Sequence, residues 1–116
     1  MLFIGNTADP VTPLGAAKKM ARGYEGSVVL TVDGPGHCSV AAVSLKAVQH
    51  IREYLHEGVL PPTGTVCKPN VVPFGSGATE EGEVAVLSRE DREILDAQAK
   101  VAESLNGVHG RARLGI

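Results

Sequence analysis

Aromatic residues are scarce in this sequence. Its 116 residues include two Phe, two Tyr and no Trp, which together make up 3% of the chain. Hydrophobic residues nevertheless account for 43%, so burial is expected, and any core must be built from Val, Leu, Ile and Ala. A chain of this length is enough for one small domain.

Clustered positive charge and long hydrophobic runs are also lacking. The 11 Lys and Arg residues are outnumbered by 13 Asp and Glu, and the net charge of −2 argues against nucleic acid or an anionic membrane as a partner. No apolar run approaches the roughly 20 residues of a membrane span. The start, MLFIGNTADP, has neither the basic leader nor the long apolar stretch of a signal peptide. We therefore expect no nucleic-acid partner and no membrane partner.

Metal-ligating residues are few and scattered. The two cysteines, Cys38 and Cys67, do not make a disulfide framework or a zinc site, although one bridge or two free thiols are both compatible with the sequence. His50 and His56 are six positions apart on a predicted helix and so face different directions. His109 is in a tail for which we expect no function. The sequence predicts no metal site.

Two short apolar runs predict β-strands. The run LFI at 2–4 ends at Gly5, and SVVLTV at 27–32 is nearly continuous in apolar and β-branched residues. Such a continuous run is typical of a parallel strand that is covered on both faces. Because a helix is predicted between the two runs, we expect the strands to be parallel, as in an α/β fold.

Apolar residues at spacings of three and four predict three helices. The first covers 13–22, with Thr12 as its N-cap and a proline at its first position. The second covers 40–57, and the third covers 89–105 with a frayed end after it. The stretch 59–77 is rich in Pro and Gly and is expected to have no regular structure.

Two candidate catalytic residues follow the two predicted strands. Asp9 follows the first, and His37 follows the second in the turn DGPGHCS. Neighbouring parallel strands lie about 5 Å apart, and open α/β sheets place their sites at the carboxyl edge. An Asp that accepts a hydrogen bond from one imidazole nitrogen orients the ring, and the other nitrogen can then serve a nucleophilic Ser. Two alternatives stay open: His37 as an ordinary turn residue, and Asp33 as a rival acid.

Four stretches of the sequence carry a family resemblance: GNTADPVTPLGAAKKMA, DGPGHCS, IREYLHEGVLPPTGTVC and PF. Together, over about residues 2–74, they resemble the C-terminal region of tripeptidyl-aminopeptidase-like (TAP-like) α/β-hydrolases. These are typically secreted serine exopeptidases, related to proline iminopeptidases. The resemblance implies a Ser, Asp, His triad in that chain order, with Asp9 as its acid and His37 as its base. It also implies a peptide substrate and no metal or organic cofactor.

The resemblance implies that the chain is the C-terminal portion of an α/β-hydrolase fold. This portion would hold the last two parallel strands with flanking helices, followed by a C-terminal helix. On this basis we divide the chain into the hydrolase part at 1–74, a linker at 75–87, and an amphipathic helix and tail at 88–116.

Three departures from the family pattern matter. No Gly-x-Ser-x-Gly nucleophile elbow is present, and the oxyanion-hole loop is missing as well. Relatives often carry Cys at the position of Lys46, and the resemblance pairs that Cys with the position of Cys67. We therefore expect a fragment of a serine hydrolase that is inactive alone and needs a missing N-terminal part or a complementing chain. An esterase-type fragment and a non-catalytic interaction module are the alternatives.

Overall fold

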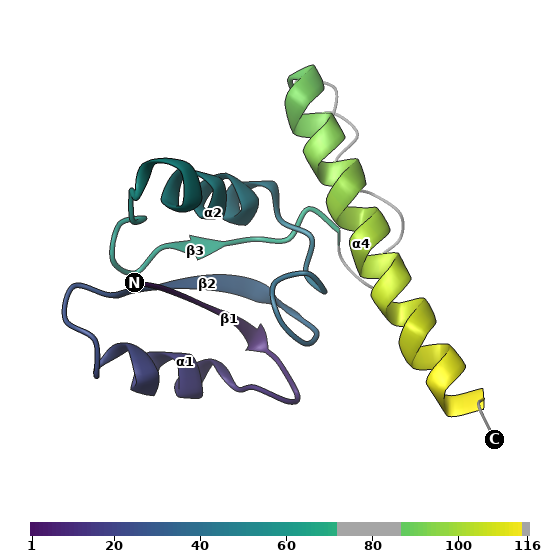
Figure 1. Ribbon diagram of the computed structural model, residues 1–116, viewed down its shortest axis with the longest axis horizontal. Coiled ribbons are helices and arrows are strands. Elements are labelled where there is room, and N and C mark those ends of the chain that lie inside the picture. Colours follow the sequence, from purple (N-terminus) through teal and green to yellow (C-terminus); the bar gives the residue numbers. More distant parts are fainter. Residues whose placement is uncertain (72–86, 115–116) are drawn as a thin grey trace.

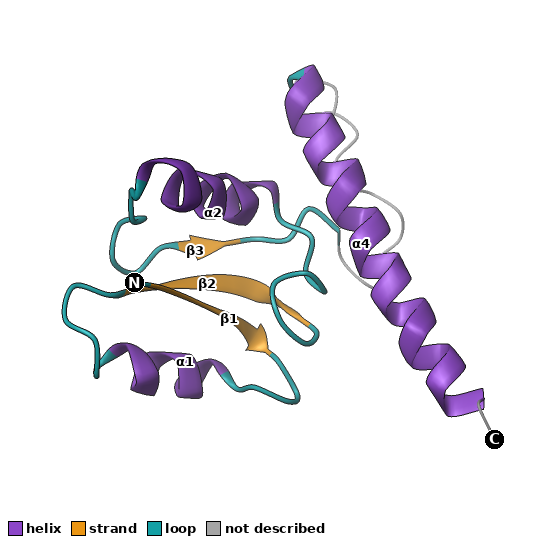
Figure 2. Ribbon diagram, in the orientation of Figure 1, coloured by secondary structure: helices purple, strands orange, loops and turns teal. Residues whose placement is uncertain are grey.

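A three-stranded parallel sheet forms the centre of the molecule (Figure 1). The computed structural model describes residues 1–71 and 87–114, with side chains described as far as residue 105. The strands lie in the order β1-β2-β3, and Figure 2 shows them between two of the helices. The elements are β1 (Leu2–Ala8), α1 (Leu14–Ala21), β2 (Val28–Pro35), α2 (Leu45–Glu57), β3 (Val66–Cys67) and α4 (Arg89–Leu114). The predicted α/β fold with a C-terminal helix is confirmed.

The two short helices cover opposite faces of the sheet. A side chain at Gly5 would meet Leu14 and Ala17 of α1, so α1 lies against the face to which residue 5 belongs. On the other face, Leu30 forms the core together with Ala47 of α2. Ile4, the residue before Gly5, is the register partner of Leu30. Because successive residues of a strand face opposite sides, Gly5 and Leu30 belong to opposite faces of the sheet.

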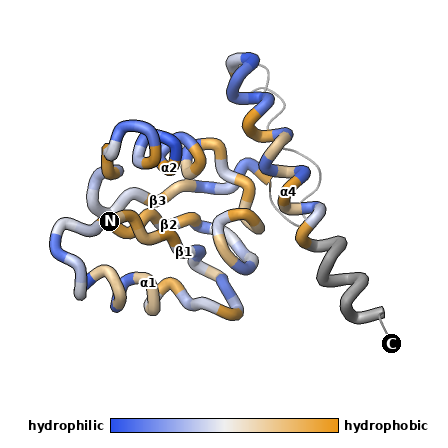
Figure 3. The backbone as a smooth tube through the Cα atoms, viewed as in Figure 1, coloured by the Kyte–Doolittle hydropathy of each residue, from blue (hydrophilic) through white to orange (hydrophobic). Residues whose placement is uncertain are grey.

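The core is small and centres on β2. Leu30 and Val32 are both 0% exposed, and they cluster with Ala42, Ala47 and Cys67. Figure 3 shows the hydrophobic residues concentrated along the strands. The run at 27–32 that predicted a strand therefore forms most of the middle strand of the sheet.

Strand β1 is longer than the predicted run at 2–4. Its pairing with β2 continues beyond Gly5 to Asn6, which is opposite Val32. The register then shifts. Asn6 is opposite Val32 but Ala8 is opposite Pro35, so β2 has one extra residue between the two pairs. Such a bulge bends the strand that carries the extra residue. As a result, the turn that follows β2 folds back on β1, and the N–H of Gly36 donates to the carbonyl of Ala8 at 3.1 Å.

The second helix begins at Leu45, not at the predicted residue 40. Its N-cap is Ser44, whose hydroxyl accepts from the N–H of Ala47 and donates to the carbonyl of Lys68. Ser44 is completely buried, so its cap depends on a segment distant in the sequence. The predicted end at residue 57 is confirmed, and Gly58 after it caps the helix with a left-handed φ of 71°.

The prediction that 59–77 has no regular structure is wrong for two of its residues. Val66–Cys67 pairs in parallel with Thr31 and Val32 as strand β3. Just after it, Asn70 accepts a hydrogen bond from the N–H of Leu45 at 2.8 Å and donates its own N–H to Val43 at 2.7 Å. Most of the predicted linker at 75–87 is outside the described residues.

Helix α4 is longer than predicted and extends past the sheet (Figure 1). It continues to Leu114 where we expected fraying after residue 105. Ser88 caps its first turn by accepting from the N–H of Asp91. Near this end α4 contacts α2 through Gln49, which donates to Asp91, and Arg52, which pairs with Glu90, both at 3.1 Å. No helix in the described part of the chain is long and apolar enough to cross a membrane.

Replacing Leu30 by Ala is expected to lower the free energy of unfolding by about 2–5 kcal/mol. The side chain is completely buried in the middle strand, and its loss leaves a cavity that the small core cannot close. Urea denaturation measures the change. The matched control is Leu55→Ala, because Leu55 on α2 is 73% exposed and its replacement should change stability by less than about 0.5 kcal/mol. Equal losses in the two variants would contradict the assignment of the core.

Candidate active site

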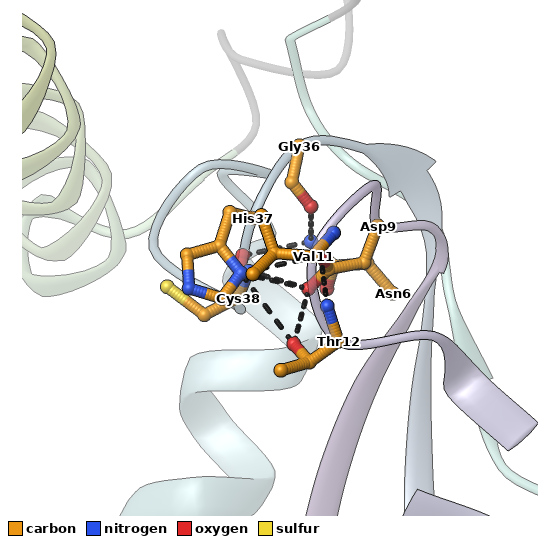
Figure 4. A network of polar contacts seen from close by, with 7 residues as sticks. All are labelled: Asn6, Asp9, Val11, Thr12, Gly36, His37 and Cys38. Atoms are coloured by element: carbon orange, nitrogen blue, oxygen red, sulfur yellow. Dashed lines mark hydrogen bonds and ion pairs between the residues drawn. The ribbon is translucent and has the colours of Figure 1, made fainter. Parts of the chain in front are cut away.

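The sheet brings Asp9 and His37 into contact at its carboxyl edge (Figure 4). Asp9 follows β1 directly, and His37 lies in the turn after β2. The Nδ1 atom of His37 is 3.2 Å from each carboxylate oxygen of Asp9, although 28 positions separate the two residues. The parallel neighbouring strands inferred from the sequence therefore produce the expected juxtaposition.

The loop after β1 folds around the carboxylate of Asp9. Its Oδ1 accepts from the N–H groups of Val11 and Thr12 at 2.8 and 2.9 Å, which is an Asx-type turn. Its Oδ2 accepts from the hydroxyl of Thr12 at 2.8 Å and from the N–H of Cys38 at 3.0 Å. The side chain of Asp9 is only 2% exposed, so its orientation is fixed from several directions.

These hydrogen bonds keep Asp9 ionised. The N–H of Cys38 is the largest influence that holds the pKa of the Asp9 carboxyl well below its usual range. Desolvation opposes this shift, and the N–H groups of Thr12 and Val11 reinforce it. An ionised carboxylate only accepts hydrogen bonds, so the Nδ1 atom that faces it must be the donor. In the neutral imidazole the free lone pair is then on Nε2.

Unusual backbone angles shape the turn that carries His37. Gly36 has a φ of 112°, and a Cβ there would lie 2.7 Å from the Cβ of Ala41, so only glycine fits. Cys38 has a φ of 59°, which is strained for a residue with a side chain. The turn leaves His37 half exposed, and Figure 4 shows its second ring nitrogen pointing away from Asp9. No hydrogen bond to Nε2 is found among residues 1–71 and 87–105.

Two further residues belong to this network, and the sequence analysis missed their roles. Thr12 was predicted to cap a helix, but α1 starts at Leu14 without a side-chain cap. The Thr12 hydroxyl instead binds Asp9 and lies 3.4 Å from Nδ1 of His37. Asn6 donates from Nδ2 to the carbonyls of Gly36 and Cys38, on either side of His37. The sequence signal for the role of Asn6 was a polar residue placed just after an apolar run.

The rival acid is occupied elsewhere. Asp33 accepts a hydrogen bond from the hydroxyl of Thr7 at 3.0 Å, and no contact between Asp33 and His37 occurs among the described side chains. Of the two acids considered from the sequence, Asp9 is the one that the fold brings to the imidazole.

Neither cysteine forms a disulfide in the structure. Cys38 is an exposed thiol and Cys67 a buried one. Burial raises the pKa of the Cys67 thiol, and the charge of Lys46 opposes that shift. Within the described residues, no group of three His, Cys, Asp or Glu side chains is placed to hold a metal ion.

Asp9→Asn is expected to lower stability at neutral pH and to change its dependence on acid. Because folding lowers the pKa of Asp9, its contribution is complete above the unfolded value of about 3.9 and is lost as the pH falls below it. The wild type should therefore lose this stability below about pH 4, and the variant should show a shallower decline. Urea denaturation between pH 3 and 7 tests this, with Asp33→Asn as a control that keeps the wild-type profile. Parallel profiles for Asp9→Asn and the wild type would contradict the assigned hydrogen bonds.

Comparison with known families now adds to the geometry. The model of the TAP-like protein family, a family of α/β-hydrolases, matches residues 1–67. This range includes β1, β2 and β3 and both candidate residues. No curated protein and no solved structure gives a significant match. The chain belongs to the TAP-like family of α/β-hydrolases.

Proposed function

We propose that this chain supplies the acid and the base of a Ser-His-Asp triad in a serine exopeptidase. The observation that carries the proposal is the position of the His37 ring. Its Nδ1 is 3.2 Å from a buried, ionised carboxylate. The side chain is half exposed, and its Nε2 makes no hydrogen bond among the described residues. This arrangement orients one nitrogen and leaves the other free for the hydroxyl of a nucleophilic serine.

In the proposed reaction His37 acts first as a general base. Its Nε2 takes the proton of a serine hydroxyl as the oxygen attacks the carbonyl carbon of the peptide bond. Asp9 stabilises the imidazolium that forms and keeps the ring in place. His37 then gives the proton to the leaving amine, and an acyl-enzyme remains. Water, activated by the same nitrogen, hydrolyses the acyl-enzyme and restores the serine.

The nucleophile must come from outside the 116 residues, because they contain no Gly-x-Ser-x-Gly segment. The sheet supports this view. Strand β1 is at one end of the strand order, and its outer edge has no partner strand among the described residues. An edge of this kind is a template for a further strand. We infer that a preceding part of the protein, or a complementing chain, pairs with β1 and places its serine near Nε2 of His37.

The 116-residue chain alone is expected to release no burst of product from a chromogenic aminoacyl or tripeptidyl substrate. Both the nucleophile and the oxyanion-hole donors are missing from this sequence, so no acyl-enzyme can form. Stopped-flow absorbance measures the burst. A burst with one equivalent of product per chain would contradict the proposed division of the triad.

The genomic reading frame upstream of Met1 gives the complementary test. We expect it to encode a Gly-x-Ser-x-Gly segment in frame, and the extended protein should cleave peptides near a free N-terminus. In that protein His37→Gln and Asp9→Asn should each lower kcat by about 10⁴-fold with little change in KM. His56→Gln, on the exposed surface of α2, is the control and should keep wild-type kcat. Cleavage of esters but not of peptides would show that the protein is an esterase and not an exopeptidase. A near-normal kcat in His37→Gln would contradict the proposed triad.

A further inference from the structure

We infer that Asn6 is a positioning residue for His37. Its Nδ2 donates hydrogen bonds to the carbonyl oxygens of both neighbours of His37, Gly36 at 3.0 Å and Cys38 at 2.7 Å. Asn6 thereby fixes the turn that presents the imidazole to Asp9. The inference rests on the proposed function for its effect on catalysis, and on geometry alone for its effect on the imidazole.

The surroundings of Asn6 are unusual for a polar side chain. It is 0% exposed in strand β1, opposite the buried Val32 and just before the register shift between the two strands. Both of its partners are backbone carbonyls, which only accept hydrogen bonds, so the NH₂ group must face them and Oδ1 must point the other way. The assignment of the amide is therefore fixed by chemistry.

The oxygen of the same amide is left without a partner. Asn6 Oδ1 is buried and makes no hydrogen bond within the described residues. A buried acceptor without a donor destabilises a fold, and an apolar side chain of similar size would avoid this penalty. What distinguishes Asn from such a side chain at this position is the pair of hydrogen bonds to the His37 turn.

The two hydrogen bonds act on a strained turn. Cys38 holds a φ of 59°, a conformation that persists in a residue with a side chain only where its surroundings enforce it. Asn6 holds its carbonyl, and Asp9 holds its N–H at 3.0 Å. Without the contact to the carbonyl, the turn can relax, and the N–H of Cys38 and Nδ1 of His37 then leave the carboxylate of Asp9 together.

The tautomer of His37 tests this chain of contacts directly. Long-range ¹H–¹⁵N NMR of the 116-residue chain, at a pH where the imidazole is neutral, distinguishes a proton on Nδ1 from one on Nε2. The wild type should hold it on Nδ1. In Asn6→Leu, which is apolar and similar in size, we expect this single tautomer to be replaced by a mixture of the two.

Thr31→Val is the matched control. Thr31 is a buried polar residue of the same sheet, 9% exposed, and has no contact with the turn among its described hydrogen bonds. It should keep the Nδ1 tautomer, which separates the loss of the contacts to the His37 turn from the general effect of replacing a buried polar residue of the sheet. Asn6→Ser, which retains a donor, covers the case in which Asn6→Leu fails to fold, and should show an intermediate tautomer ratio. A folded Asn6 variant with an unchanged Nδ1 tautomer overturns the inference.

Kinetics of the extended protein separate this inference from the proposed function. Asn6→Leu should lower kcat by about 10²-fold, the size of effect expected when a catalytic group is misplaced by about 1 Å, with KM nearly unchanged. If the extended wild type has no hydrolase activity, the proposed function fails and the tautomer still decides the role of Asn6. If the wild type is active and Asn6→Leu keeps both its kcat and its tautomer, only the inference about Asn6 fails.

Discussion

The parallel pairing of β1 with β2 is the constraint on which the rest of the structure depends. Parallel neighbours end at the same edge of a sheet, so the loops after the two strands must meet. The pairing is held by burial of Leu30 and Val32 in the middle strand. The register shift after Asn6 then bends the end of β2 and brings the turn after it back to Ala8. Contact between an acid and an imidazole far apart in the sequence follows from this pairing.

At that edge, one carboxylate joins the two loops. Asp9 accepts from the loop that it begins, through Val11 and Thr12, and from the other loop, through the N–H of Cys38 and Nδ1 of His37. The same group is therefore a structural tie and the candidate orienter of the imidazole. The pKa of its carboxyl is low for a related reason, because the hydrogen bonds from the N–H groups of Cys38, Thr12 and Val11 favour the charged form. A change at Asp9 must consequently affect folding and the chemistry of the site together.

The local sequence was sufficient for the parts of the fold that depend on local rules. The β-branched run of β2, the glycine stop after α2 and the positions of Asp9 and His37 at strand ends all follow from spacing and residue type. Strand β3 could not be predicted, because two residues in a Pro-rich stretch become a strand only by pairing with Thr31 and Val32. The start of α2 was misplaced for a similar reason, since the buried cap at Ser44 needs the carbonyl of Lys68.

Among the polar residues of the candidate site, two could be predicted from the sequence and two could not. Asp9 and His37 were predicted as a candidate pair because each follows a predicted strand, and the two strands were expected to be parallel neighbours. The roles of Asn6 and Thr12 depend on atoms that only the tertiary fold brings within reach: two carbonyls of the His37 turn and the carboxylate of Asp9. Membership of the TAP-like α/β-hydrolase family, matched over residues 1–67, agrees with the observed α/β fold.

The central claim is that Asp9 and His37 interact directly, and a double-mutant cycle tests it most directly. The free energy of unfolding is measured at pH 7 for the wild type, Asp9→Asn, His37→Gln and the double variant. We predict a favourable coupling energy, because the 3.2 Å contact is lost in either single variant and cannot be lost twice. Effects of the two single substitutions that simply add in the double variant would contradict the claim.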